Sequence, residues 1–168
     1  SFFIETLESN KLLIIDSRSN IFLINNFKSQ STFEMEDVKL IENDIKNDVD
    51  RVLDSFLYNN KLFISFESRE KNKCKKFKIF VAELDEKFMS FDTFFVDNSC
   101  KSILNSGRML NFKFDKEQGL LFAVSAARYD FPTKEPQDES SNFGKILFKS
   151  FNTKKIKVFS KGHRLILG

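Results

Sequence analysis

The chain is patterned as short apolar runs separated by turn residues, which is typical of β-strands joined by hairpins. Residues 12–15 and 21–24 are two such runs, and the polar turn 16–20 between them predicts the first hairpin. Later runs lie at residues 52–58, 61–66, 77–84, 88–96, 107–114, 120–124, 143–148 and 156–159.

The clearest alternation is in residues 77–84, where Phe77, Ile79 and Val81 fall on one face of the expected strand. The four runs between residues 52 and 96 are separated by short turns, which predicts an antiparallel meander. A parallel α/β fold would need helical crossovers of about a dozen residues, and the chain has no room for them. The fold class is therefore all-β, and the pattern alone leaves both a sandwich and a propeller open.

Residues 25–50 are polar and weakly patterned, and we interpret them mostly as loop. The spacing of Ile45, Val49 and Val52 leaves a short helix there as an alternative. A single domain over residues 1–168 fits the length. Aromatic residues between 77 and 95 are expected to pack between sheets: Phe77, Phe80, Phe88, Phe91, Phe94 and Phe95.

The composition indicates which broad class of protein this is. Apolar residues make up 41% and charged residues 30% of the chain, as in globular domains, and 22 Phe argue against disorder. No apolar run approaches the roughly 20 residues that span a bilayer, and no signal peptide is visible. Both ends are apolar where natural termini are usually polar, so we expect a domain truncated at both ends.

The net charge of +3 comes from a lysine-rich surface. The densest basic cluster, residues 69–78, is interrupted by Glu70, Asn72 and Cys74, and it is typical of a hairpin tip. A nucleic-acid site would instead gather basic residues on one face with stacking aromatics, so no nucleic-acid partner is expected.

The two cysteines, Cys74 and Cys100, do not have zinc-binding spacing, and one His cannot complete a zinc set. The predicted strands place both at strand ends of the same meander. This placement favours a disulfide over two unpaired thiols, and a disulfide would imply an oxidising compartment.

Several segments, in order, resemble the soluble PQQ-dependent glucose/sorbosone dehydrogenase family. The similar segments cover the first hairpin, the Gly-Arg strand at Gly107-Arg108 with the strand that follows it, and the run Gln-Asp-Glu-Ser-Ser-Asn-Phe-Gly-Lys-Ile-Leu at 137–147. Gly162-His163-Arg164 resembles the start of the family's Gly-His-Arg-Asn-Pro-Gln-Gly motif. After Arg164 the chain departs from that motif, and only Gly168 agrees.

The resemblance implies antiparallel meanders that form two to three blades of a six-bladed β-propeller. It also implies PQQ and calcium as cofactors, a sugar or related small-molecule alcohol as substrate, and a periplasmic or secreted protein. The family's calcium ligands fall beyond Gly168, and only Asp138 is left as a contributor to a metal site.

The family's catalytic base is a His four residues before the Arg of the Gly-Arg strand, and here that position is Leu104. The Asp that orients the His corresponds to Ala126. Neither leucine nor alanine can accept a proton, so the resemblance predicts no catalytic residues in this chain.

Among the matching positions, Arg164 corresponds to the family's cofactor-binding arginine, and a guanidinium suits the carboxylates of PQQ. His163 is expected to pack or to form hydrogen bonds. Gly107 is expected where the backbone is too crowded for a side chain, and Arg108 is expected to brace a loop. Gln137, Asp138, Ser140 and Ser141 are expected to organise a loop.

Two functions follow from these observations. The first is a PQQ-dependent sugar dehydrogenase-like protein that transfers hydride from an aldose or alcohol to PQQ, or a degenerate version of it. The alternative is a non-catalytic β-propeller that binds a carbohydrate or a protein partner, because a fold can outlast its catalytic groups.

Overall fold

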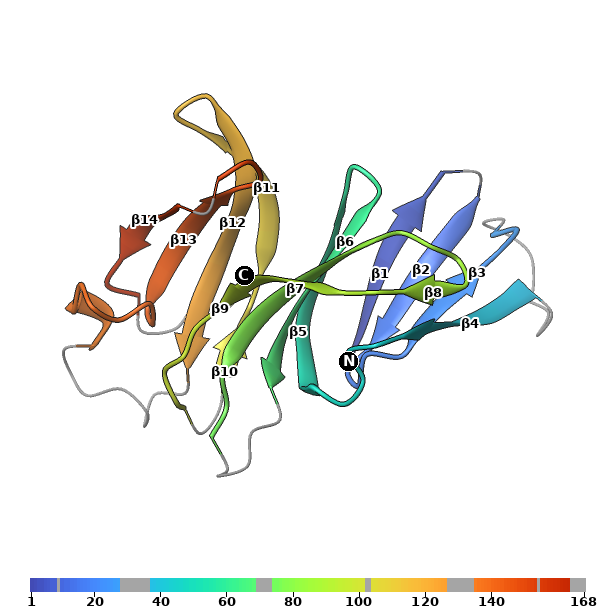
Figure 1. The fold of residues 1–168 in the computed structure, drawn as a ribbon, viewed down its shortest axis with the longest axis horizontal. Helices are drawn as coiled ribbons and strands as arrows, with labels where there is room; N and C mark the ends of the chain where they lie inside the picture. Colours follow the sequence, from blue (N-terminus) through green and yellow to red (C-terminus); the bar gives the residue numbers. More distant parts are fainter. Residues whose placement is uncertain are drawn as a thin grey trace.

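The computed structural model describes residues 1–8, 10–27, 37–68, 74–101, 104–126, 135–153 and 155–163. The chain forms three β-sheets in a row, as predicted for an all-β protein (Figure 1). In these residues no helix is long and apolar enough to cross a membrane.

The first sheet has the order β1-β2-β3-β4-β8. Its strands are β1 (Phe2–Leu7), β2 (Lys11–Asp16), β3 (Ile21–Ile24), β4 (Val38–Asn43) and β8 (Phe88–Met89). The central sheet has the order β5-β6-β7-β9. Its strands are β5 (Val49–Tyr58), β6 (Lys61–Ser68), β7 (Phe77–Glu83) and β9 (Asp92–Val96).

The third sheet contains β10 (Leu104–Ser106), β11 (Met109–Phe114), β12 (Glu117–Ala126), β13 (Lys145–Ser150) and β14 (Ile156–Lys161). Both β10 and β11 pair with β12, which continues through β13 to β14. A short 3-10 turn, Glu135–Gln137, precedes β13.

Tight turns join the hairpins where the sequence predicts them. Asn59 and Asn60 between β5 and β6 have φ angles of 48° and 60°, and Asp115 and Lys116 between β11 and β12 have 49° and 68°. Consecutive positive φ values mark the turn type whose twist matches that of antiparallel strands. Asn and Asp tolerate this backbone region better than most residues, which explains their place in these turns.

The central sheet is covered on both faces because its apolar residues alternate between two cores. Leu62, Ile64 and Phe66 of β6 point into the first core, which lies between the first and central sheets. Phe63 and Phe77 point into the second core, between the central and third sheets. This double burial explains why nearly all of β6 is buried.

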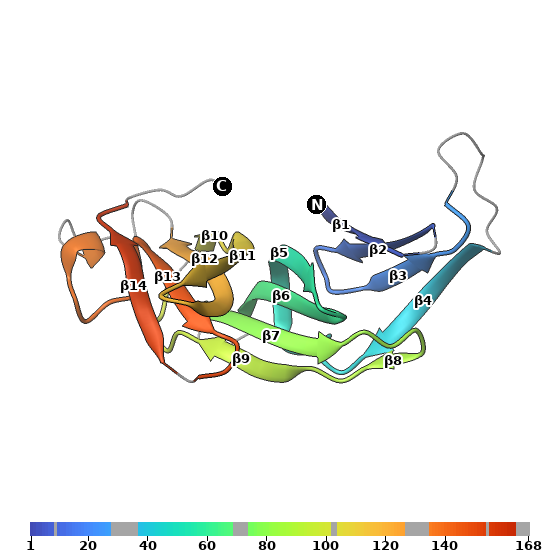
Figure 2. The same ribbon diagram turned by 90° about the horizontal axis from the view of Figure 1, so that it is seen from above.

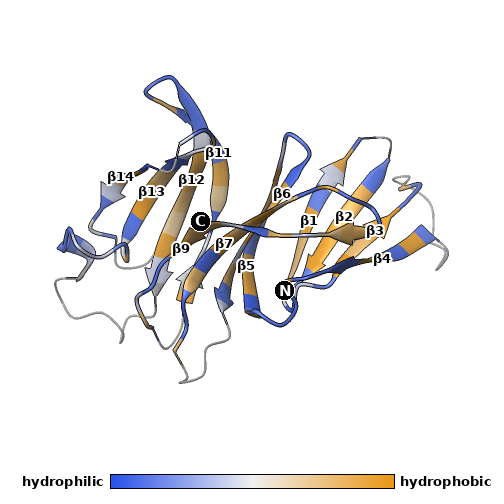
Figure 3. Cartoon of the chain, viewed as in Figure 1, coloured by the Kyte–Doolittle hydropathy of each residue, from blue (hydrophilic) through white to orange (hydrophobic). Residues whose placement is uncertain are grey.

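The outward faces of the first and third sheets remain apolar and exposed. Phe2 and Ile4 are 71% and 62% exposed on the first sheet, and Leu110 and Phe159 are 48% and 43% exposed on the third. Figure 3 shows hydrophobic residues along β2 and β3, and Figure 2 shows that no further sheet covers either end of the row. The described sheets therefore form an open row and not a closed ring.

Two predictions about the strands and one about aromatic packing were wrong. Part of the predicted loop 25–50 is strand, because β4 pairs with β3 and β5 already begins at Val49, so the alternative helix is absent as well. The run 88–96 is not one strand: β8 pairs in parallel with β4, and β9 pairs antiparallel with β7. Of the six aromatic residues predicted to pack between sheets, Phe88 is 50% exposed.

Candidate functional site

The first strands of the three sheets lie side by side. β5 packs against β1 on one side and against β10 and β11 on the other. In Figure 1 the hairpin tips β1–β2, β5–β6 and β11–β12 lie along the upper edge, and β5 and β10 begin near the lower edge. We call this lower edge, with the starts of β1, β5 and β10, the loop end.

An ion pair between the half-exposed Arg51 and the buried Glu67 holds residue 104 at the loop end. Glu67 on β6 is 5% exposed and accepts a hydrogen bond from the Leu104 amide at 2.7 Å. The Nη2 atom of Arg51 on β5 lies 2.9 Å from Glu67 Oε1 and also donates to the Leu104 carbonyl oxygen. The two side chains thus fix both polar groups of residue 104. We call this set the Arg51–Glu67 clamp.

Leu104 itself is fully buried in the second core, among apolar side chains. Its Cα partner across the β10–β12 pair is Ala126, so the two positions at which the family resemblance expects a His and an Asp do lie opposite each other. Neither the leucine nor the alanine at these positions can accept a proton. The Arg51–Glu67 clamp thus fixes the backbone of residue 104, while the leucine side chain at this position takes no part in proton transfer.

Gly107 and Arg108, next along the chain, have structural roles. A Cβ atom at Gly107 would lie 2.6 Å from Ser65 Oγ, and that hydroxyl donates to the Gly107 carbonyl oxygen at 2.7 Å. Arg108 Nη1 lies 3.2 Å from Asp54 Oδ1, and Asp54 also accepts from the Met109 amide at 2.8 Å. Burial raises the pKa of Asp54, against the effect of these hydrogen bonds and of the Arg108 charge.

The segment that resembles the family's Gln-Asp run is organised around a buried lysine. Lys145 is 1% exposed and its Nζ atom donates to the carbonyl oxygens of Asp138 and Ser141. The amide and hydroxyl of Ser140 donate to the Asp138 carboxylate and lower its pKa. These contacts hold the loop in place, and Asp138 belongs to no group of three or more His, Cys, Asp or Glu side chains among the described residues.

His163 follows β14 and contacts its neighbours through two hydrogen bonds. Its amide donates to the Gly144 carbonyl oxygen at 3.0 Å, and its Nε2 atom lies 2.7 Å from Ser160 Oγ. Arg164, which corresponds to the family's cofactor-binding arginine, lies outside the described residues.

The structure joins Cys74 and Cys100 in a disulfide, with their Cα atoms 5.2 Å apart. The neighbouring residues Lys75 and Lys101 exchange backbone hydrogen bonds of 2.8 and 3.1 Å. Both contacts tie the segment after β6 to the segment before β10, so they brace the same edge as the Arg51–Glu67 clamp.

An open hollow of about 490 Å³ lies at the loop end beside this clamp. The residues that line it are polar or charged, and they contribute both their polar groups and their aliphatic stems: Ser1, Ser17, Arg18, Asp50, Arg51, Glu67 and Lys75. Within it Lys75 is paired with Asp50, and Arg51 with Glu67. The size falls in the range of small-molecule sites, and the paired charges offer both donors and acceptors to a neutral, hydroxyl-rich ligand.

Solved structures of other proteins share this fold. One, "Crystal structure of glucose dehydrogenase", superposes on 97% of this chain with a TM-score of 0.69 at 13% sequence identity. A second glucose dehydrogenase superposes on 97% of the chain with a TM-score of 0.67 at 14% identity. The chain has a glucose dehydrogenase-like fold.

This glucose dehydrogenase-like chain spans about half the length of both structures, 52% of one and 55% of the other. No family model and no curated protein matches its sequence. The all-β, glucose dehydrogenase-like fold expected from the sequence resemblance is thereby confirmed, and at this low identity the match shows the fold alone.

The sequence did not identify the charged residues that organise the loop end. Arg51 and Glu67 fall in segments where their neighbours dominate the pattern, and their shared partner Leu104 lies 53 and 37 residues away. Lys145 donates to the nearby residues Asp138 and Ser141, but its burial is not visible in the sequence. A charged residue that directly follows an apolar run, such as Glu67 after Phe66, is the one signal that could have pointed to a buried, paired carboxylate.

Proposed function

We propose that the protein is a catalytically degenerate sugar dehydrogenase-like propeller that binds an aldose or related alcohol at the loop end without oxidising it. The fold is that of a glucose dehydrogenase, and the observation that carries the proposal is Leu104. Oxidation of an alcohol needs a base for the hydroxyl proton. The position expected to provide it is a fully buried leucine opposite Ala126.

The hollow at the loop end supports sugar binding. Arg18, Asp50 and Lys75 line it together with the Arg51–Glu67 clamp. Carboxylates accept from sugar hydroxyls, and guanidinium and ammonium groups donate to them, so hydrogen bonds to a sugar would be charge-assisted on both sides.

The remaining architecture is proposed on the same basis. Two exposed apolar sheet faces and a match to about half of each glucose dehydrogenase support a six-bladed propeller, with these three sheets as three of its blades. The disulfide supports an oxidising compartment, and we propose the periplasm or the outside of the cell.

The described residues do not by themselves fit PQQ with calcium. Among them, no three His, Cys, Asp or Glu side chains come together to hold a metal ion. Arg51 and Lys75 are already paired with carboxylates, and Arg164 lies outside the described part. We therefore assign no reaction step to that pair of cofactors.

A second candidate is an active PQQ-dependent sugar dehydrogenase, which the fold match to two glucose dehydrogenases favours. In that case the proton acceptor and the cofactor ligands would have to come from residues other than 104 and 126.

Two measurements separate the candidates. The first is glucose-dependent dye reduction by the folded protein after loading with PQQ and calcium, with the Leu104→His, Ala126→Asp double variant beside it. We expect no turnover by the unmodified protein. Turnover as fast as that of the double variant would refute the degenerate function and favour the active enzyme.

The second measurement is the thermal midpoint with and without D-glucose. A ligand bound to the folded state stabilises by about 2.7 kcal/mol at a hundredfold excess over Kd, so the midpoint should rise. Arg18→Met should reduce the rise, because it removes a donor of the hollow. Lys87→Met, at an exposed turn, is the matched control and should leave it unchanged. No rise with glucose would refute sugar binding at the loop end.

A further inference from the structure

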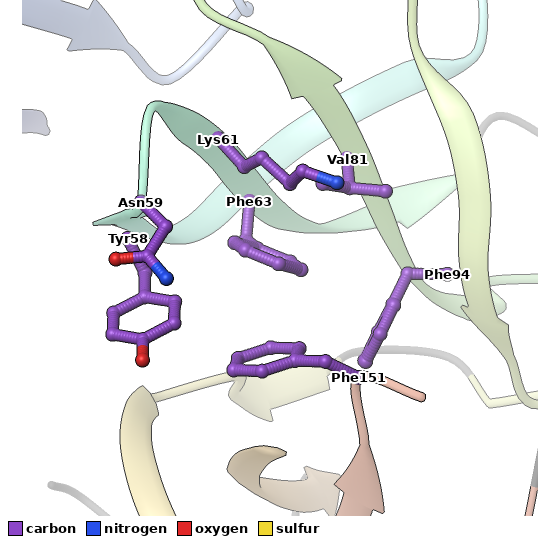
Figure 4. A pocket seen from close by; sticks show the side chains of 7 residues that line it. All are labelled: Tyr58, Asn59, Lys61, Phe63, Val81, Phe94 and Phe151. Atoms are coloured by element: carbon purple, nitrogen blue, oxygen red, sulfur yellow. The ribbon is translucent and has the colours of Figure 1, made fainter. Parts of the chain in front are cut away.

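A second pocket lies at the other end of the central sheet, at the tip of the β5–β6 hairpin. It has a volume of about 240 Å³ and is lined by Tyr58, Asn59, Lys61, Phe63, Val81, Phe94 and Phe151 (Figure 4). Tyr58 and Arg51 stand at opposite ends of β5, so the rise of a strand separates this pocket from the Arg51–Glu67 clamp by about 23 Å. The two sites share no lining residue.

Four aromatic rings form the wall of this aromatic pocket. The rings of Tyr58 and Phe151 stack at 5.2 Å between centroids, with an interplanar angle of 18°. Phe63 meets Phe94 edge-on at 5.3 Å, and Phe63 and Phe151 lie 5.6 Å apart. The rings come from β5, β6, β9 and the residue after β13, so two sheets hold the pocket open.

The aromatic wall is only partly covered by the rest of the protein. Phe63 is 2% exposed, whereas Tyr58, Phe94 and Phe151 are only partly buried. Lys149 stands over the Phe94 ring at 4.7 Å and donates to the Phe94 carbonyl oxygen, which fixes that ring from behind. Aromatic faces that remain in contact with water favour a flat apolar ligand, since its burial removes apolar area from water.

The rim is polar and cationic. Figure 4 shows the Lys61 side chain extending across the opening above Phe63 toward Val81, with the Asn59 amide on the neighbouring side. Lys61 Nζ lies 3.1 Å from Glu83 Oε1, but the two side chains are 50% and 67% exposed. An exposed pair of this kind contributes little, so the ammonium group can turn to a ligand at small cost.

We propose that the aromatic pocket binds a small aromatic carboxylate with a single ring. The ligand ring packs against the wall formed by Phe63, Phe94 and Phe151, and the carboxylate accepts from Lys61 Nζ and the Asn59 amide. The volume is below the range of drug-sized sites and leaves room for one ring with a short polar group. The cation at the rim favours an acidic group on the ligand, and the wall of stacked rings favours a flat ring.

The probe is 4-fluorobenzoate, followed by 19F NMR during titration with the folded chain. For a ligand of this size we expect a dissociation constant on the order of 1 mM. The neutral compound 4-fluorobenzyl alcohol should bind about tenfold more weakly, because it lacks the charge that Lys61 recognises. Equal binding of the two compounds would overturn the assignment of a carboxylate ligand.

Three variants locate the site. Lys61→Met keeps the aliphatic stem and removes the charge, and it should weaken 4-fluorobenzoate about tenfold. Val81→Phe should abolish binding by filling the pocket. Lys39→Met makes the same charge change on exposed β4, in the first sheet, and should leave the affinity unchanged. If Lys61→Met and Lys39→Met bind alike, or the wild type does not bind, the proposal is wrong. Glucose binding at the loop end should persist in Lys61→Met, so failure here is distinct from failure of the proposed function.

Discussion

Replacement of Glu67 by leucine is expected to lower the free energy of unfolding by more than the loss of one charge suggests. Glu67 is 5% exposed and is the acceptor for the buried Leu104 amide, as well as the partner of Arg51. An amide left unpaired in a buried position costs about 1–3 kcal/mol. The ion pair adds less, because the Arg51 side chain is 47% exposed and can turn to water.

The expected loss for Glu67→Leu is therefore about 2–3 kcal/mol of unfolding free energy, out of the roughly 5–15 kcal/mol of a typical domain. Glu67→Gln keeps an acceptor for the Leu104 amide and should lose about 1 kcal/mol. Urea unfolding followed by circular dichroism measures the difference. With a slope of about 1–3 kcal/mol per M, Glu67→Leu should lower the midpoint by about 1–2 M.

The control is Glu83→Leu, which removes a glutamate of the same sheet whose side chain is 67% exposed. Its effect should stay within about 1 kcal/mol, because exposed ion pairs contribute little. If Glu67→Leu and Glu83→Leu shift the midpoint equally, the Arg51–Glu67 clamp does not stabilise residue 104 and the reasoning fails.

Three further outcomes are expected. Gly107→Ala should destabilise the protein, since its Cβ would lie 2.6 Å from Ser65 Oγ; an unchanged urea midpoint would contradict this. Burial raises the pKa of Asp54 above its usual 3.8, so its ionisation opposes folding: as pH rises from about 3.8 through the raised pKa, wild type should lose stability relative to Asp54→Asn, and a relative gain would reverse the sign. The disulfide between Cys74 and Cys100 closes a 26-residue separation, so reduction should cost roughly 3 kcal/mol, and two reactive thiols in the unreduced protein would disprove the bond.

The sequence predicted the strands well wherever one face alternates clearly. The run around Phe77 and the Asn59-Asn60 turn are local signals, and the structure has both as predicted. The strand β4 was missed because Lys39 and Glu42 interrupt its apolar residues, and the partner strand β3 supplies the missing information.

The break between β8 and β9 shows a second kind of limit. The Asp44 carboxylate accepts from the Ser90 hydroxyl at 2.8 Å and from the Phe91 amide at 3.0 Å, and the chain turns there from one sheet to the next. These partners are 46 and 47 residues apart, so no local pattern reveals them.

The candidate site was predictable only where it resembles a known family. That resemblance directed attention to residues 104 and 126, which are Cα partners across β10 and β12, while their correspondence to a catalytic pair stays a prediction. The Arg51–Glu67 clamp and the aromatic pocket depend on contacts between sheets, and neither their spacing nor their composition sets them apart in the sequence.

The segment that contains β8 and β9 passes from the first sheet to the central sheet, and this limits where the chain can be cut when sheets are exchanged between proteins. Because residues 88–96 belong to two sheets, the first sheet is not a self-contained module. A recombination event or an engineered fusion that cuts the chain between β4 and β5 would leave β4 without its outer neighbour, which the following sheet donates. Exchange of whole sheets between related proteins is thus expected to succeed only when the cut follows β9.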